Sequence, residues 1–330
     1  MKLLVTTGFG NIIQGGADIW VNHFIELVLP KLKDEYIIFV DGKKPIGFET
    51  QIENFHFHGD DSKRSKKLLE ECDEIHFLHA NYHKREHLWK HKDKWGIIFV
   101  HAYLPDMLKY GDSVKQFNTN INEDDFLELL HYCKKRVWIG NNDSQLFKDF
   151  PKETHTVTNF YEFKENALPN VRNSKIGFTS RIESRKNIHY LNGFDGVVLS
   201  NQYDWKNITE NSDYDFSKYK FYQWDINILE PFMKLNWGIS HSCHTNEPFG
   251  YSIFQAVDWG KLPIIHEDWG KECDYKYRAK DLLSFQFTYN EILRDTRMKH
   301  LKEFMKLKSY MKKFDNKKKW AKKISVFFNS

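Results

Sequence analysis

Short apolar runs alternate with helix-like segments along this chain, and the rhythm occurs twice. In the first half, runs typical of buried strands cover 3–6, 36–40, 74–78, 96–100 and 136–139. Apolar residues recur with helical spacing in 20–33, 62–71 and 123–134. Strands that alternate with helices favour a parallel sheet, because each parallel connection has to cross from one end of the sheet to the other.

The same rhythm restarts after Pro169. Five more strand-like runs cover 175–179, 196–199, 220–223, 237–241 and 262–266, with a helix expected over 247–259. A length of 330 residues fits two domains. We therefore expect an α/β protein with two doubly wound, Rossmann-like domains facing one another across a cleft, joined by a polar linker within 162–174. The expected limits are 1–165 and 174–305, with a basic C-terminal helix over 306–330 that packs back toward the first domain.

Several classes of protein are excluded by composition. The chain has no run of 18 apolar residues, and its first residues lead directly into a strand-like segment, which is not typical of a signal peptide. The four cysteines lie far apart and form no C-x-x-C pair, so we expect reduced, buried thiols. These features predict a cytoplasmic protein without stable membrane insertion, in the host cytoplasm if a phage encodes it.

The charge is concentrated at the C-terminal end. Between positions 297 and 323 there are 12 Lys and Arg against two acids, so this segment carries +10 and the rest of the chain −6. One interpretation is a solvated amphipathic helix with the buried stripe Leu301, Met305, Tyr310, Phe314, Trp320, Ile324 and Phe327. The other is a surface for a phosphate-rich polymer or an anionic lipid. Charge by itself favours the solvated helix.

Two segments carry residues suited to binding an anionic ligand. The first strand is followed by T-G-F-G-N-I-I-Q-G-G-A-D, a glycine-rich turn whose backbone can approach an anion at a helix N-terminus. It is neither G-x-G-x-x-G nor a P-loop. The second segment is E-P-F-G from Glu247, with Gln255 two helical turns further. A carboxylate there can hold sugar hydroxyls, although an ordinary helix with an acidic first turn explains the same pattern.

The second segment also carries a family resemblance. E-P-F-G-x-x-x-x-Q-A-x-x-x-G-x-x-P-I resembles the nucleotide-sugar signature of retaining glycosyltransferases of the GT-B fold. Three further segments match in order: G-G at 15–16, V-T-N-F at 157–160, and S-R-I-E-S-R-K-N at 180–187. The resemblance covers nearly the whole chain, and it implies a GT-B glycosyltransferase that takes a nucleotide-sugar donor, most simply a UDP-sugar.

The resemblance implies a role for each matching residue. Arg181 and Lys186 would bind the donor diphosphate, Glu247 the transferred sugar and Gln255 the ribose. The backbones of Gly15, Gly16, Phe249 and Gly250 would approach the phosphates, and His101 would lie beside the reacting sugar. There are departures: Gln255 replaces the usual second Glu, Asn187 replaces a Gly, and the family's H-D pair is His101-Ala102, with Asp106 the nearest acid in sequence. No D-x-D is found at a strand end, so we expect that no metal is required.

Within the family, the chain resembles the DNA α-glucosyltransferases of T-even bacteriophages, which modify 5-hydroxymethylcytosine. The likeness rests on I-I-F-V-H, W-I-G-N-N-D-S-Q-L-F, T-V-T-N-F and F-T-S-R-I-E-S-R-K-N. It implies double-stranded DNA with hydroxymethylated bases as partner, the base being flipped out to react. Candidate DNA contacts, interleaved with Trp89 and Trp95, are Lys63, Arg64, Lys66, Lys67, His83, Lys84, Arg85, Lys90, Lys92 and Lys94.

Two alternatives remain open from the sequence. One is a glycosyltransferase with a saccharide or lipid-linked acceptor, its basic C-terminal segment lying on an anionic membrane. The other is a DNA- or nucleotide-binding relative without turnover, supported by Gln255 and the missing H-D pair. The oligomeric state is not indicated.

Overall fold

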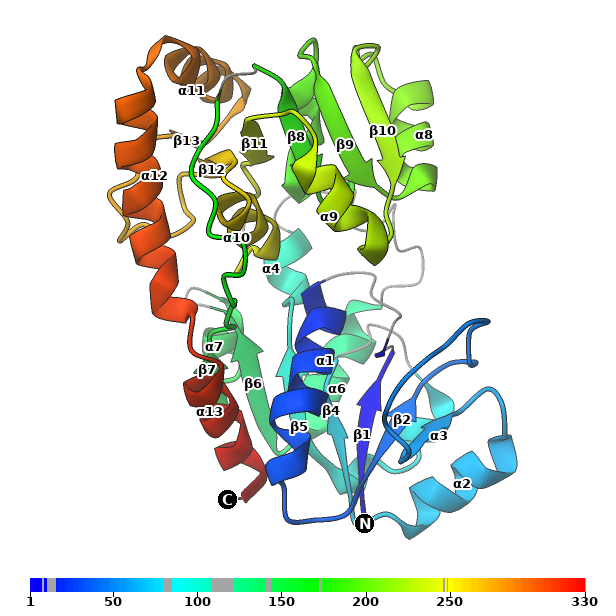
Figure 1. Cartoon of the computed structure of the whole chain (residues 1–330). Coiled ribbons are helices and arrows are strands. Elements are labelled where there is room, and N and C mark those ends of the chain that lie inside the picture. The colour runs from blue at the N-terminus through cyan, green and yellow to red at the C-terminus, as the bar shows by residue number, and fades with distance from the viewer. Residues whose placement is uncertain are drawn as a thin grey trace. The chain divides into compact units, whose positions relative to one another are not determined.

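The chain divides into two compact units, Met1–Phe160 with Asn316–Ser330, and Tyr161–Asp315 (Figure 1). The computed structural model describes residues 1–7, 9–10, 16–79, 85–108, 122–140, 144–171, 174–245, 247 and 249–329. The first unit ends five residues before the expected limit of 165, and residues 306–315 lie in the second unit. The cleft expected between the two units depends on how they are placed relative to one another, so it stays a prediction.

The first unit is built on a seven-stranded sheet of order β3-β2-β1-β4-β5-β6-β7. Every neighbouring pair in it is parallel. The strands are β1 (Lys2–Thr6), β2 (Tyr36–Val40), β3 (Phe55–Phe57), β4 (Glu74–Phe77), β5 (Trp95–Val100), β6 (Lys135–Ile139) and β7 (Thr154–Val157). All six residues of β5 are buried, which explains its continuous apolar run, since helices cover both faces of a central parallel strand.

Helices pack on both faces of this first sheet. The helices are α1 (Gly16–Leu27), α2 (Ser62–Glu71), α3 (Glu86–Trp89), α4 (Leu104–Leu108), α6 (Glu123–Tyr132), α7 (Leu146–Asp149) and α13 (Lys317–Asn329), with short 3₁₀ turns η1 (Leu29–Lys31) and η2 (Lys92–Lys94). One face of the core is formed by residues of α1 and α13, such as Trp20, Phe24 and Trp320. The other is formed by residues of α2 and α6, such as Leu68 and Leu129. The C-terminal helix therefore completes the first unit.

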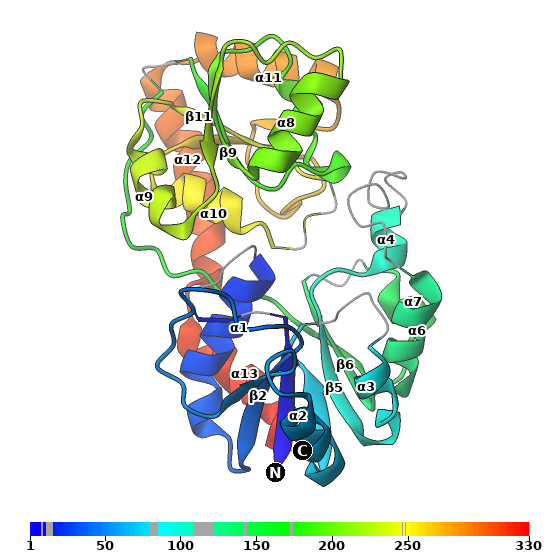
Figure 2. The ribbon, with the colours of Figure 1, turned by 90° about the vertical axis from the view of Figure 1, so that its right-hand side faces the viewer.

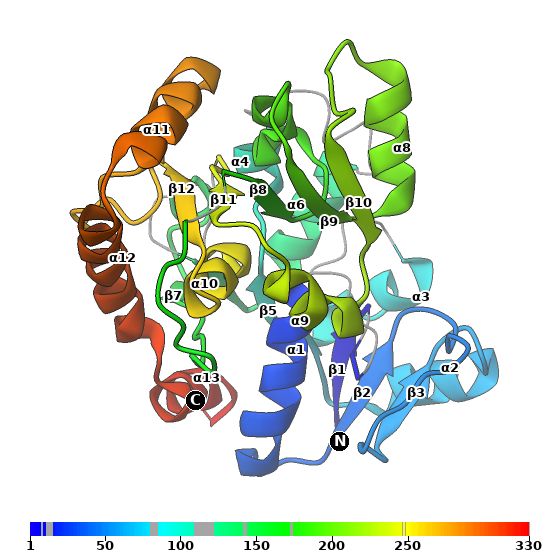
Figure 3. The same ribbon diagram turned by 45° about the horizontal axis from the view of Figure 1, so that its top comes forward.

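The second unit repeats the doubly wound plan with a six-stranded sheet of order β10-β9-β8-β11-β12-β13. Figure 3 shows β8 to β12 of this sheet. Its pairs are also parallel. The strands are β8 (Ile176–Thr179), β9 (Gly196–Ser200), β10 (Tyr219–Gln223), β11 (Ile239–Ser242), β12 (Leu262–His266) and β13 (Arg278–Ala279). The predicted α/β class with two parallel-sheet domains is confirmed.

The helices of the second unit alternate with its strands. They are α8 (Gln202–Asn211), α9 (Ile226–Lys234), α10 (Tyr251–Asp258), α11 (Leu282–Arg294) and α12 (Arg297–Met311), with the 3₁₀ turns η3 (Ser184–Lys186), η4 (Ile188–Leu191) and η5 (Lys312–Phe314). Within the described part of the chain, no helix is both long enough and apolar enough to cross a membrane. The four cysteines are free and buried, as predicted.

All ten predicted strands are present, but three short strands were missed. These are β3, β7 and β13, and each lies at the edge of its sheet. Edge strands pair on one side only and are shorter, so their sequences lack the continuous apolar run that marks a central strand. His56, Thr154, Thr156 and Arg278 interrupt these three segments.

The stripe predicted for the basic C-terminal segment is partly wrong. Two helices, α12 and α13, replace one continuous helix, because η5 and Asn316, whose side chain accepts a hydrogen bond from the Lys319 amide, break it. Met305 is 47% exposed, whereas Phe304 is buried instead. Met305 lies in α12, before the break, so the predicted stripe is out of phase within α12 itself, where Phe304, Leu307 and Met311 are buried. Trp320 and Ile324, after the break, are buried as predicted.

A buried carboxylate holds the segment that enters the second unit. Asp258, at the end of α10, is 2% exposed, and it accepts hydrogen bonds from the backbone amides of Lys164 (3.0 Å), Glu165 (3.0 Å) and Asn166 (2.9 Å). The hydroxyl of Tyr161 donates to it at 3.3 Å. The first part of the polar linker expected within 162–174 is therefore fixed to the second unit.

We expect Asp258→Ala to lower the free energy of unfolding by about 2 to 4 kcal/mol, because three amides lose their acceptor. Asp258→Asn keeps one acceptor oxygen, so its loss should be smaller. Chemical denaturation of both variants measures the difference. Equal stability of Asp258→Ala and the unmodified protein would contradict the role given to this carboxylate.

Candidate functional site

Two loops of the second unit bring together most of the residues expected to bind the donor. The loop after β8 carries Arg181, Glu183, Arg185 and Lys186, and the loop after β11 carries His244 and Glu247. β8 and β11 are neighbours, but β9 lies on the other side of β8, so the strand order reverses between them. In doubly wound sheets, ligands bind outside the carboxyl ends of the strands at this switch point.

The centre of the site is a buried group of charged side chains. Lys186 Nζ donates a hydrogen bond to Glu247 Oε2. The Arg185 guanidinium lies 3.5 Å from the same oxygen, and His244 Nδ1 lies 3.6 Å from it. The side chains of Lys186, Arg185 and Glu247 are 8%, 9% and 12% exposed. Lys186, Arg185 and His244 thus all contact the same Glu247 oxygen, Oε2.

A second carboxylate joins the outer arginine to this group. Glu183 lies 3.1 Å from Arg181 Nε and 3.0 Å from Arg185 Nε. Arg181 is the most open member, with 59% of its side chain exposed. Three cations thus face two carboxylates, and His244 is neutral because burial lowers its pKa to about 4. The group carries one surplus positive charge at the switch point.

Burial and charge act in opposite directions on these groups. Burial by itself would raise the pKa of Glu183, but Arg181, Arg185 and Lys186 lower it to about 2. Burial would likewise raise the pKa of Glu247, and Lys186, His244 and Arg185 hold it well below its usual range. Burial and the neighbouring Arg185 lower the pKa of Lys186 to about 8, against the effect of Glu247. Both carboxylates therefore stay ionised at neutral pH.

Two backbone positions with positive φ shape the loops. Asn187 has φ 52°, a conformation that favours glycine and that Asn tolerates better than most residues. Its side chain donates hydrogen bonds to the Cys243 carbonyl at 2.8 Å and to Thr245 Oγ1 at 2.9 Å, joining the two loops. Asn187 therefore occupies the backbone geometry expected of the family's glycine.

Gly250 is the second such position, with φ 79° directly before α10. A Cβ at Gly250 would lie 2.8 Å from Ile253 Cδ1 and 3.1 Å from Glu247 Cγ, so a side chain would disturb both the helix and the carboxylate. α10 begins at Tyr251, not at Glu247 as predicted. Glu247 therefore lies outside the helix, and the interpretation of an acidic first helical turn is wrong.

The remaining residues expected at the donor site lie in α10 or just before it. Phe249 is buried and stacks on Phe254 with ring centroids 4.4 Å apart, while its carbonyl accepts a hydrogen bond from Trp269 Nε1. Gln255 lies in α10 and is half-buried. Phe249 therefore holds the start of the helix by packing, which the sequence pattern did not reveal.

The sequence did not single out Glu183, Arg185 or His244. Arg185 precedes Lys186 in the string S-R-K-N, and this position beside a predicted site residue could have identified it. His244 and Glu183 gave no such signal, because their importance follows from which loops the sheet places together. The Nε2 atom of His244 is buried and has no hydrogen-bond partner in the described residues.

The other predicted residues lie in the first unit. His101 follows β5, and its Nε2 lies 3.0 Å from the Leu78 carbonyl. Burial and the neighbouring His79 lower its pKa to about 3, so the ring is neutral. Asp106 does not lie free, because it accepts hydrogen bonds from Ser144 Oγ and the Gln145 amide. Gly16 begins α1, while Gly15 lies outside the described residues.

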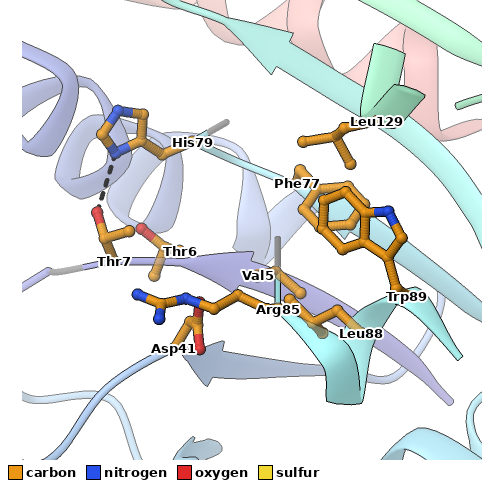
Figure 4. A pocket seen from close by; sticks show the side chains of 10 residues that line it. All are labelled: Val5, Thr6, Thr7, Asp41, Phe77, His79, Arg85, Leu88, Trp89 and Leu129. Atoms are coloured by element: carbon orange, nitrogen blue, oxygen red, sulfur yellow. Dashed lines mark hydrogen bonds and ion pairs between the residues drawn. The ribbon is translucent and has the colours of Figure 1, made fainter. Parts of the chain in front are cut away.

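A pocket lies at the carboxyl edge of the first sheet (Figure 4). Thr7, after β1, hydrogen-bonds His79, after β4, with 3.0 Å between Oγ1 and Nδ1. Beside Thr6, Arg85 Nε donates to Asp41 Oδ2 at 2.9 Å (Figure 4). The pocket is lined by Val5, Thr6, Thr7, Asp41, Phe77, His79, Arg85, Leu88, Trp89 and Leu129.

Many of the candidate DNA contacts have partners inside the first unit. Arg85 pairs with Asp41, Lys66 with Glu70, Lys67 with Glu71 and Lys92 with Glu128. Lys94 donates to two carbonyls at the end of α2. Lys63, Arg64 and Lys90 are exposed, and His83 and Lys84 lie outside the described residues. Trp89 and Trp95 are 8% and 0% exposed, so the expectation of aromatic side chains interleaved on a binding surface is wrong.

Comparison with known proteins identifies the fold. No protein-family model and no curated protein sequence matches the chain. Among solved structures, sucrose-phosphate synthase from Thermosynechococcus elongatus is 12% identical with a TM-score of 0.69, covering 99% of this chain and 98% of that one. The lipopolysaccharide outer core galactosyltransferase WaaB is 11% identical with a TM-score of 0.58, covering all of both chains.

A DNA-modifying enzyme is also among the similar structures. The β-glucosyltransferase of T4 phage, in complex with UDP-glucose, is 10% identical with a TM-score of 0.54, covering all of both chains. Another structure of this enzyme, at 9% identity and a TM-score of 0.53, holds UDP and Mn²⁺. The resemblance to GT-B glycosyltransferases, a phage DNA glucosyltransferase among them, is confirmed at the level of the fold.

The low pKa of Lys186 predicts how anion binding should depend on pH. The lysine is charged below pH 8 and loses its charge above it, so we expect the affinity of this site for inorganic diphosphate to fall as pH rises from 8 to 10. In Lys186→Arg the charge persists, because a guanidinium stays protonated throughout this range. Titration calorimetry of both proteins measures the difference. An identical fall in both proteins would assign the effect to another titrating group, the diphosphate itself included.

Proposed function

We propose that this protein is a retaining glycosyltransferase that moves a sugar from a UDP-sugar to the hydroxymethyl group of 5-hydroxymethylcytosine in DNA. The observation that carries the donor half is the buried group of Lys186, Arg185 and Glu247 at the switch point of the second sheet. Its surplus positive charge suits a diphosphate, and its carboxylate suits sugar hydroxyls.

The donor would change the partners of this group. Without ligand, Lys186 and Arg185 share Glu247 Oε2. A diphosphate offers both cations new oxygen partners, and Glu247 is then free to accept hydrogen bonds from sugar hydroxyls. The N-terminus of α10, which Gly250 turns into the site, adds backbone amides and the positive end of a helix dipole. Arg181, more exposed, would complete the contacts to the phosphates.

Catalysis would be electrostatic. Negative charge grows on the diphosphate as the glycosidic bond breaks, and Lys186, Arg185 and Arg181 stabilise it where it develops. A phosphate oxygen of the leaving group can take the acceptor proton, which fits the retaining assignment. These fixed cations do for the diphosphate what a metal ion does elsewhere, so we propose that no metal is required.

The acceptor half is supported by two observations. One of the similar structures is a phage enzyme described as DNA modifying, and the chain's positive charge is concentrated in one segment. Other similar structures are named for sucrose-phosphate and lipopolysaccharide chemistry, which keeps a saccharide acceptor as the competing hypothesis.

Lys186→Ala should lower turnover about 100- to 1000-fold, while donor affinity falls by about ten-fold or less, because the lysine acts mainly on charge that develops in the transition state. Steady-state kinetics with calorimetry of UDP-glucose binding separate the two quantities. Lys175→Ala is the control, since Lys175 stands at the amino end of β8 and pairs with Asp195. Equal losses in binding and rate would contradict the assigned role.

The acceptor is tested by mass spectrometry of DNA containing 5-hydroxymethylcytosine after incubation with a panel of UDP-sugars. We expect a mass increase of one sugar residue per modified base, and unmodified cytosine DNA should gain nothing. The reaction should continue in EDTA. Complete loss with the chelator and recovery with a divalent ion would overturn the metal-free mechanism, and transfer to free saccharides alone would overturn the DNA acceptor.

A further inference from the structure

α13 presents an exposed row of lysines on the first unit. The helix reads K-K-K-W-A-K-K-I-S-V-F-F-N, with five lysines and no acid. Lys317, Lys318, Lys319, Lys322 and Lys323 are all exposed. At 100° per residue, Lys318, Lys319, Lys322 and Lys323 span an arc of about 140° on two successive turns. They form one continuous basic face, here called the lysine face.

The opposite face of α13 is fully used by the core. Trp320, Ala321, Ile324 and Phe328 are buried, and Trp320 lies edge-on to Trp20 of α1 at 5.8 Å between ring centroids. α13 lies beside α1 in the ribbon (Figure 2). A helix held in this way presents its lysines from a rigid support, so their position does not depend on folding upon binding.

The lysine face differs from the basic part of α2 in its neighbours, because α2 ends in two glutamates and α13 carries no acid. On α2, Lys66 and Lys67 each have a glutamate one turn away. Among the described residues, Lys318, Lys319, Lys322 and Lys323 have no ion pair with any carboxylate. Their charge is therefore not neutralised within the protein.

We propose that the lysine face binds the phosphate backbone of double-stranded DNA. The four lysines cover about 7.5 Å along the helix axis, at 1.5 Å per residue. Duplex DNA carries one negative charge per about 1.7 Å, so about four phosphate charges fall within the same length. Contacts of this type position a duplex and release counterions without reading its sequence.

An anionic membrane fits the lysine face less well. A helix that binds a membrane inserts an apolar face between the lipids, together with its lysines. In α13 that apolar face is already buried in the core, and Val326, at 55%, is the one apolar side chain of the helix that is largely exposed. The remaining surface is suited to a charged polymer.

The inference rests on the proposed function in one respect, because the lysine face would be a binding surface for the DNA acceptor that lies outside the proposed catalytic site. The test replaces Lys318, Lys319, Lys322 and Lys323 by Gln in one variant of the full chain. Its affinity for an unmodified DNA duplex is measured by fluorescence anisotropy between 50 and 200 mM salt. We expect the negative slope of log K against log salt to become shallower by about three to four units, at about 0.9 per lost phosphate contact.

The matched control replaces Lys206, Lys234, Lys271 and Lys299 by Gln, four exposed lysines that each have a carboxylate partner one turn away. The change in net charge is the same, but the salt slope should change by less than about one unit. Circular dichroism melting of both variants checks the fold. Equal changes in slope would show that net charge decides binding, and would overturn the proposal.

Two further measurements separate this inference from others. The first is sedimentation with phosphatidylserine vesicles. If the wild type sediments with the vesicles and the lysine-face variant does not, while both bind duplex DNA equally well, the proposal is overturned in favour of a membrane. Transfer to the free nucleoside 5-hydroxymethyl-2′-deoxycytidine should be unchanged in the lysine-face variant. If the wild type binds DNA through these lysines but transfers no sugar, the proposed function is contradicted and the DNA-binding surface is still supported.

Discussion

The shared contact of Lys186 and Arg185 with one oxygen of Glu247 is the interaction on which the site depends. Two cations and a carboxylate removed from water are costly unless each has a partner, and removal of one partner of such a pair typically costs 3–5 kcal/mol. Together they hold the loops after β8 and β11 in register at the switch point. A ligand that replaces the carboxylate must therefore be an anion.

The backbone of the two loops is built to make this contact. Asn187 takes the left-handed conformation and joins the loops through its side chain, and Gly250 turns the chain so that α10 starts beyond Glu247. Asn187 stands where the pattern that the sequence resembles has Gly, and Asn suits this position because it tolerates positive φ and adds a hydrogen bond that glycine lacks. The structure gives no comparable compensation at Gln255.

Positive charge occurs in two different environments in this protein. In the second unit, Lys186 and Arg185 are buried, so their charge acts strongly over a short distance. On α13, the lysines are exposed and weak individually, and their effect comes from number and spacing. Buried cations suit a compact diphosphate at a site of chemistry, whereas the exposed row suits an extended polymer.

The sequence by itself determined the two doubly wound units and the strands that bear the site, because central parallel strands such as β5 are apolar along their whole length. It also indicated Lys186, Glu247 and Gly250 through local strings. Only the tertiary structure decided that Arg185, Glu183 and His244 complete the charged group, and that Trp89 and Trp95 belong to the core. The physical reason is that strand order, which no local pattern encodes, sets which loops meet and which side chains are buried.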